Sequence, residues 1–357
     1  MNESTGTRYQ RLRRTAQVVS LSVGAAWLSV VVFTPLGGGI ARWAEQVSAD
    51  WAFVLFVATL VLIWEVVALP VSLIATVQGE RRFRKSHIGL PALLVNRARD
   101  ATTGIAIVLV GAWLIRLSIQ WAGPWWWLAV GALGAPLLMV MTALAGVSVR
   151  VAPGSRPLVR QALAERLSTL AQRACGHRVP VLEWADPVAA PTALVTGIGR
   201  SGAILLSKEM VADWSDDEIA VVVAHELSHH ARRDLWRKAS LDALVTLLAL
   251  WAADRVVATF GPPLGATHLA SLMAFPLIAL TAWVMWSVLR PLRLAQSRAH
   301  EREADRYAIA LTGNADAFRT AIRRMAAHHL AEERPSALTR WFFHRHPTVE
   351  ERINQAR

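Results

Sequence analysis

Long apolar runs restrict the possible folds of this chain more than any other feature of its sequence. A helix needs about 20 apolar residues to cross a hydrocarbon core of about 30 Å. Runs of roughly that length occur at 17–36, 51–77, 101–122, 125–149, 239–260 and 269–289. The sequence therefore predicts a mainly α integral-membrane protein with about six transmembrane helices, and membrane lipid as one partner.

Composition supports the same fold class. Of the 357 residues, 54% are hydrophobic and only 18% are charged, which is too apolar for an ordinary soluble domain of this size. The chain also has 16 Trp residues, and Trp collects at the membrane–water interface. Several ionisable residues fall within the predicted spans, among them Glu65, Arg116, Asp242 and Asp254. Such residues usually face a partner helix or a water-filled cavity rather than lipid.

The distribution of basic residues predicts the topology. Arginines precede the first span and the loop at 78–100 is strongly basic, whereas the connections at 37–50, 123–124 and 261–268 hold one Arg between them. Basic loops remain preferentially in the cytoplasm. We therefore expect both termini and the long polar segments to be cytoplasmic, as in a protein of a bacterial inner membrane.

The formal net charge of +12 does not indicate nucleic-acid binding. The basic residues are spread over the segments that flank the spans and do not gather on one periodic face. Anionic lipid headgroups are the simpler partner for them. Cys175 is the only cysteine, so no intramolecular disulfide can form.

Hydropathy divides the chain into four parts. Residues 1–149 contain four predicted spans and residues 239–289 contain two, while the segments 150–238 and 290–357 are polar. The first polar segment predicts a helix at 157–175 and then a small β-sheet. The expected strands are at 179–184, 192–196 and 203–206.

A metal-binding pattern follows the predicted sheet. Ser215 and Glu218 form a capping-box pattern, which predicts a helix that contains His225-Glu226-Leu227-Ser228-His229. Positions i and i+4 lie about 40° apart on a helix, so both imidazoles can bind one metal ion. Glu226 points to the flank, where it can take a proton from water that the metal activates.

A third ligand is expected from the C-terminal polar segment. A catalytic zinc takes three protein ligands and leaves its fourth position to water. Glu301 can bind the metal, while Asp305, four residues later on the same helix face, accepts a hydrogen bond from the second ring nitrogen of a ligand histidine. Glu303 is the alternative ligand, although its position turns it away from Asp305. We expect one Zn²⁺ per chain.

These motifs resemble those of a known family. HELSH at 225–229, SRAHEREADRYA at 297–308 and the ending that begins at His346-Pro347 are similar to the type I CAAX prenyl proteases and the related bacterial heat-shock membrane proteases. These are zinc peptidases of the gluzincin type. The resemblance implies a cytoplasmic zincin-like metalloprotease domain in which the positions of His225, His229 and Glu301 hold zinc and that of Glu226 is the base.

The resemblance also implies roles in substrate binding. His346 would stabilise the tetrahedral oxyanion, and Arg352 would support it. The edge strand beside which a substrate peptide lies would consist of Thr192, Ala193, Leu194, Val195, Thr196 and Gly197. The family usually has Asn where this chain has Thr192, so a side-chain amide that would hold the peptide is missing here.

The expected function is therefore hydrolysis of peptide bonds in membrane-associated or prenylated-type protein substrates. Two alternatives remain open. A sensor-transducer metalloprotease of the antirepressor type shares the pattern with Arg232-Arg233-Asp234 after it. A non-catalytic membrane protein could instead hold a structural metal. We expect His230, a further 100° around the helix from His229, to be solvated, and His300 to lie at the surface.

Overall fold

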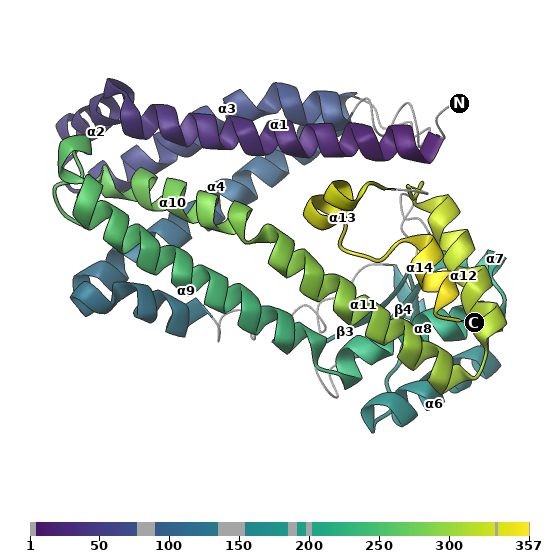
Figure 1. Ribbon diagram of the computed structural model, residues 1–357. Coiled ribbons are helices and arrows are strands. Elements are labelled where there is room, and N and C mark those ends of the chain that lie inside the picture. The colour runs from purple at the N-terminus through teal and green to yellow at the C-terminus, as the bar shows by residue number, and fades with distance from the viewer. Residues whose placement is uncertain are drawn as a thin grey trace.

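The computed structural model describes residues 5–76, 90–134, 154–184, 191–197, 202–332 and 335–356. Long helices run side by side along one axis, and a small mixed α/β region lies at one end of them (Figure 1). Helix α1 begins and helix α14 ends at that same end (Figure 1). The prediction of a mainly α membrane protein with a small β-sheet is confirmed.

The helical bundle provides the candidate membrane spans. Its helices are α1 (Thr5–Phe33), α2 (Pro35–Val47), α3 (Ala52–Thr76), α4 (Leu90–Ala122), α9 (Asp234–Phe260) and α10 (Ala274–Val288). Among the described residues, four helices are long and apolar enough to cross a membrane. A fifth is counted only if α10 and α11 (Arg290–Thr312), which are bent by 46° relative to each other, form one span.

The count of six predicted spans is not reproduced, and the fourth predicted run is described only as far as residue 134. Gly123, with φ of 51°, begins a 3₁₀ turn over Gly123–Trp125, and residues 126–134 are helical again. Gly131 lies so close to α9 that an added Cβ would be 2.5 Å from a Leu247 methyl group. The start of this run therefore packs on α9.

Polar residues inside the bundle are paired with protein groups. Glu65 of α3 binds Arg97 of α4, and Asp242 of α9 accepts a 2.6 Å hydrogen bond from Arg293. The buried Asp254 accepts one of 2.9 Å from the Trp126 indole. Of the two arrangements expected for such residues, the structure shows contacts with neighbouring helices.

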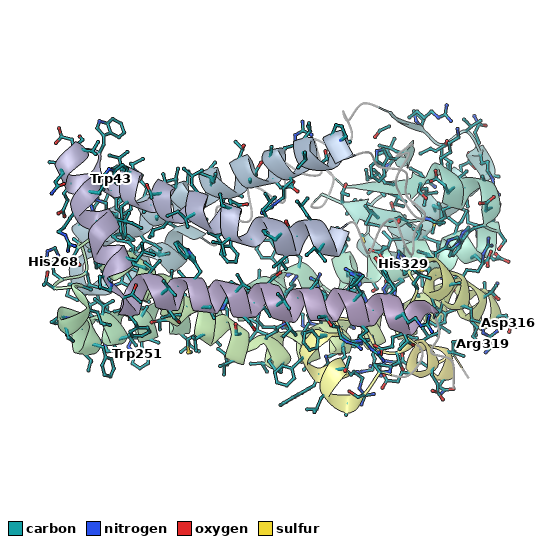
Figure 2. The ribbon with its side chains drawn as sticks, turned by 90° about the horizontal axis from the view of Figure 1, so that it is seen from above. Trp43, Trp251, His268, Asp316, Arg319 and His329 are labelled. Carbon is teal, nitrogen blue, oxygen red and sulfur yellow. The ribbon has the colours of Figure 1, made fainter. Side chains whose placement is uncertain are left out.

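The end of the bundle away from the sheet is rich in exposed aromatic residues. Trp43 and Trp251 are both 46% exposed, and they lie at that end together with His268 (Figure 2). Indole rings at the ends of apolar helices favour the headgroup layer of a bilayer. This distribution agrees with a bundle that spans the membrane along its long axis.

The sheet has four described strands in the order β1-β2-β4-β3. They are β1 (Ser155–Pro157), β2 (Val181–Trp184), β3 (Ala193–Thr196) and β4 (Ala203–Ser207). β2 and β4 are parallel, and β3 pairs antiparallel with β4 at one edge. All three predicted strands are present. The helix expected from residue 157 begins later, as α6 (Gln161–Cys175), because residues 155–157 pair with β2.

Helix α8 (Asp216–Ala231) lies at the centre of this region. Its capping box is present, with Ser215 accepting from the Glu218 amide and Glu218 accepting in return from Ser215. Ile219, Val223 and Leu227 are buried in one core with residues of the sheet and α6. The other helices of the region are α7 (Lys208–Asp213), α12 (Ala315–His328), α13 (Ala337–Phe343) and α14 (Val349–Asn354). Because α8 is buried on most sides, its side chains are held in a fixed orientation.

Candidate metal centre

Two helices bring the three predicted ligands together. α8 carries His225 and His229, and α11 packs against α8 and carries Glu301. His225 Nε2 lies 3.4 Å from Glu301 Oε2, and His229 Nε2 lies 3.7 Å from Glu301 Oε1. One ligand atom of each residue lies within 4.8 Å of the other two. Two imidazole nitrogens and one carboxylate oxygen therefore converge on one point.

The donor set fits a zinc ion. Two His and one Glu are the three protein ligands of one common class of catalytic zinc sites. Glu301 is 8% exposed. Its Oε2 lies 3.4 Å from His225 Nε2 and 2.8 Å from His346 Nδ1, but it accepts no hydrogen bond of normal geometry from the described residues. A buried carboxylate oxygen without a hydrogen bond is costly, and coordination of a cation would offset that cost. Within the described part of the chain, the group has these three members.

The second ring nitrogen of His225 is held by Asp305. His225 Nδ1 lies 2.9 Å from Asp305 Oδ1, and Asp305 is completely buried. Arg352 donates to both Asp305 oxygens, at 2.8 and 2.6 Å. Burial lowers the pKa of His225, but its contacts with the carboxylates of Asp305 and Glu301 outweigh burial and raise that pKa to about 9. The site is therefore arranged to stabilise positive charge at His225 Nε2.

The second ring nitrogen of His229 is held by Asp234, a contact that the sequence analysis missed. Its Nδ1 lies 3.0 Å from Asp234 Oδ2. Asp234 is the first residue of α9, and the turn before it includes Arg233 with φ of 56°, a left-handed conformation. This turn directs the start of α9 back to the end of α8. The signal for this contact in the sequence is the position of Asp234, five residues after His229 and just beyond the end of the metal-binding helix.

Glu303, the alternative ligand, faces other partners. Its carboxylate binds Arg232 and lies 3.2 Å from the Arg237 guanidinium. Both arginines also lie within 3.9 Å of Asp234. Glu303 therefore belongs to a charge network beside the ligands, and the structure favours Glu301 for the metal position.

Glu226 and His346 line one small cavity beside two of the ligands, His225 and Glu301. This cavity measures about 90 Å³, and its lining includes His225, Glu301 and Arg352. The His346 side chain is 62% exposed, and its Nδ1 lies 2.8 Å from Glu301 Oε2. Arg352 shares the cavity with His346, but its guanidinium is bonded to Asp305. Its expected support of an oxyanion therefore remains a prediction.

Strand β3 lies over α8, and the predicted surroundings of two histidines are wrong. His230, expected to be solvated, is half-buried, and its Nε2 lies 3.0 Å from the Val195 carbonyl oxygen. His300, expected at the surface, is 7% exposed and lies 3.9 Å from Asp234. Helical spacing placed both side chains correctly on their helices, but it could not show that β3 and α9 cover those faces. His230 thus links the edge strand to the metal-binding helix.

Substitution of Asp234 tests whether its contact with His229 supports metal binding. Asp234→Ala is expected to weaken zinc binding by roughly 10- to 100-fold, because His229 loses the group that orients its ring. Zinc affinity is measured by competition with a chromogenic chelator. Asp316→Ala is the matched control, because Asp316 also lies in the first turn of a helix and pairs with an Arg three residues later. Asp316 is exposed and lies at the outer edge of the molecule (Figure 2). Equal affinity in the two variants would contradict the role of Asp234.

Comparison with known proteins identifies the family. Residues 157–357 match the model of peptidase family M48. The chain is 28% identical over 256 residues to an uncharacterized metalloprotease, YhfN, of Bacillus subtilis, covering 70% of this chain and 59% of that protein. It is 31% identical over 185 residues to a protease HtpX homolog of Kineococcus radiotolerans, covering 50% of this chain and 58% of the relative.

The match thus spans about three-fifths of the length of these relatives. A crystal structure of Ste24p from S. mikatae has the same fold, with a TM-score of 0.77 and 18% sequence identity. The similarity covers 99% of this chain and 87% of that one. Because the family model matches more than half of the chain and includes both ligand-bearing helices, the chain belongs to peptidase family M48.

Proposed function

We propose that this protein is a zinc-dependent metalloendopeptidase that cleaves membrane-associated proteins, with one zinc ion held by His225, His229 and Glu301. The observation that supports this most directly is the position of Glu226. It lies between the two histidines in the sequence and lines the same cavity as His225 and Glu301. A structural zinc would more commonly have four protein ligands, whereas three members are found here among the described residues.

When bound, zinc supplies a Lewis acid that polarises the scissile carbonyl and makes water more acidic. Glu226 takes a proton from the attacking water and delivers it to the leaving amine. His346 lies at the open side of the ligand group, where an imidazole N–H can donate to the developing oxyanion. Asp305 and Asp234 keep His225 and His229 oriented with Nε2 toward the metal position.

Strand β3 is the proposed binding edge for the substrate backbone. It pairs with β4 on one side, and Leu194 is 42% exposed. An extended peptide can add to such an edge as a further strand. His230 fixes β3 relative to α8 through the Val195 carbonyl, so a peptide paired with β3 would lie at a set distance from Glu226.

The substrate is proposed to be held by the membrane. α9 begins at Asp234, five residues after His229, and α11 begins at Arg290, 11 residues before Glu301. At 1.5 Å per helical residue, the metal position lies within roughly 20 Å of the ends of the membrane bundle. A protein anchored in the bilayer can therefore present a flanking segment to the site. We place this site on the cytoplasmic side of a bacterial inner membrane, on the basis of the basic loops, and include prenylated-type chains among the substrates.

Tethering provides the test. A peptide attached to a lipid anchor is expected to be cleaved at least about tenfold faster than the same peptide free in solution, because the membrane raises its effective concentration at the site. Both peptides are assayed with the protein in nanodiscs at equal total concentration. Nanodiscs that contain Glu226→Gln measure background hydrolysis. Equal rates for the two peptides would contradict a membrane-held substrate, and absence of zinc-dependent cleavage of either would contradict the peptidase assignment.

A further inference from the structure

Helix α13 has an exposed apolar face outside the predicted spans. Leu338, Trp341 and Phe342 are 70%, 53% and 38% exposed. Their spacing of i, i+3 and i+4 places them on one side of the helix. The Trp341 and Phe342 rings are in edge-to-face contact, with centroids 5.4 Å apart. This face contains three large apolar side chains that the described part of the chain leaves exposed.

The position of α13 places this face at the membrane boundary. α13 packs against α11 and lies beside the junction of α10 and α11 (Figure 1). Phe343, its last residue, lies under the Arg290 guanidinium at 5.5 Å, and Arg290 follows the end of α10 by two residues. In the view from above, α13 stands out at the edge of the molecule (Figure 2). The exposed face is therefore at the level where the apolar helices end.

The charges around α13 are basic. Arg340 lies within the helix, Arg345 follows it and is exposed, and Arg290 lies against its end. Trp and Phe beside arginines are typical of helices that lie in the headgroup layer, where the rings enter the acyl boundary and the guanidinium groups meet phosphates. Of these three arginines, Arg340 is bound by Glu351, whereas Arg345 and Arg290 can meet lipid phosphates.

We propose that α13 is an interfacial helix that binds the anionic headgroup layer of the bilayer through Leu338, Trp341 and Phe342. Membrane contact of this protein is then not limited to its spanning helices. The contact continues the surface of the spanning helices onto the catalytic region.

Hydrogen bonds connect α13 with the helix that carries the metal ligand Glu301. Arg298 of α11 is buried, and its Nη1 donates to the Arg340 and His344 carbonyl oxygens at 3.1 and 2.8 Å. These bonds attach the end of α13 to the helix that carries Glu301, one turn away. His346 follows His344 by two residues and lies beside Glu301. A bilayer that holds α13 therefore also holds the segment that positions His346, a consequence that rests on the proposed peptidase function.

Depth-dependent quenching tests the contact without reference to activity. In a Cys175→Ser background, Leu338→Cys is labelled with an environment-sensitive fluorophore, and the full chain is placed in nanodiscs. Lipids brominated near the headgroup end of the acyl chain are expected to quench this label several-fold more than a label at Asp316→Cys. Asp316 is exposed and lies at the far end of the catalytic region (Figure 2). Equal quenching at the two positions would overturn the proposal.

Two further results separate the possible occupants of this face. Quenching is expected to increase when anionic phosphatidylglycerol replaces part of the phosphatidylcholine, and less so in Arg345→Gln. The same quenching at both compositions would overturn the anionic preference. If a second copy of the chain covered the face, Leu338→Cys would form intermolecular disulfides at low protein-to-lipid ratio. That result would overturn lipid as the occupant.

The consequence for His346 has its own readout. Trp341→Asp is expected to reduce cleavage in bilayers several-fold with zinc content unchanged. Phe260→Asp is the matched control. It also replaces an exposed apolar residue, but Phe260 is the last residue of α9, whose first residue, Asp234, lies at the metal centre. Its activity should remain near that of the wild type. Quenching at position 338 with full activity of Trp341→Asp would leave the lipid contact standing and overturn its link to His346. Loss of zinc in Trp341→Asp would also overturn that link.

Discussion

Glu226→Gln is expected to bind zinc as the unsubstituted protein does and to cleave peptides at least about 100-fold more slowly. The amide has nearly the same shape as the carboxylate but cannot take a proton from water at neutral pH. Glu226 is half-buried and lines the cavity beside His225 and Glu301, and it is not a member of the convergent ligand group. A 100-fold loss corresponds to about 2.7 kcal/mol of transition-state stabilisation. Metal analysis of purified protein and single-turnover cleavage of a tethered peptide measure the two quantities.

A second glutamate provides the control for this substitution. Glu218→Gln also removes a carboxylate from α8, but Glu218 caps the start of the helix and binds Arg324. The Glu218→Gln variant should have a lower free energy of unfolding but the same cleavage rate per folded molecule. If Glu226→Gln turned over substrate at the unsubstituted rate, another group would have to be the base. If it lost zinc, Glu226 would be a ligand.

Glu301→Ala is expected to lose zinc and activity together. The substitution removes one of three ligand atoms, so that only His225 and His229 remain to hold the ion. Glu303→Ala is the matched control from the same helix, because it removes a carboxylate that binds Arg232 and Arg237 instead of facing the ligand group. We expect Glu303→Ala to keep about one zinc per chain. Zinc per folded chain is measured after dialysis against a weak chelator.

The opposite result would move the ligand assignment. If Glu301→Ala kept its zinc and Glu303→Ala lost it, α11 would have to be rotated relative to α8 from the orientation seen in the structure. Loss of zinc in both variants, with normal folding by circular dichroism, would indicate that the charge network around Asp234 contributes as much to binding as the third ligand does. The first outcome is not compatible with the distances of 3.4 and 3.7 Å between Glu301 and the two imidazoles.

Local signals in the sequence were sufficient for the elements of the site. The capping box at Ser215 and Glu218 predicted where α8 begins, and α11 ends at Gly313, which is in the left-handed conformation that glycine adopts readily. Helical spacing then placed His225 with His229, and Glu301 with Asp305. These relations lie within one or two turns of a single helix, so they depend on backbone geometry that the residues themselves determine.

Contacts between elements were decided by the tertiary structure. The face of α11 that packs against α8 carries Glu301 to the histidines and leaves Glu303 beside Arg232 and Arg237. The left-handed turn at Arg233 brings Asp234 back to His229, and the packing of β3 over α8 gives His230 a carbonyl partner. The exposed face of α13 is also defined only by what the rest of the chain leaves uncovered.

The same distinction applies in the membrane bundle. Apolar length predicted that helices such as α3 and α9 would span the bilayer, because burial in lipid depends on the summed hydropathy of one segment. Length could not show that Glu65 binds Arg97 or that Asp254 binds Trp126. The sequence by itself determined each helix, its caps and the residues on each face. The tertiary structure decided which faces meet, because packing depends on side chains far apart in the chain whose contacts no local pattern encodes.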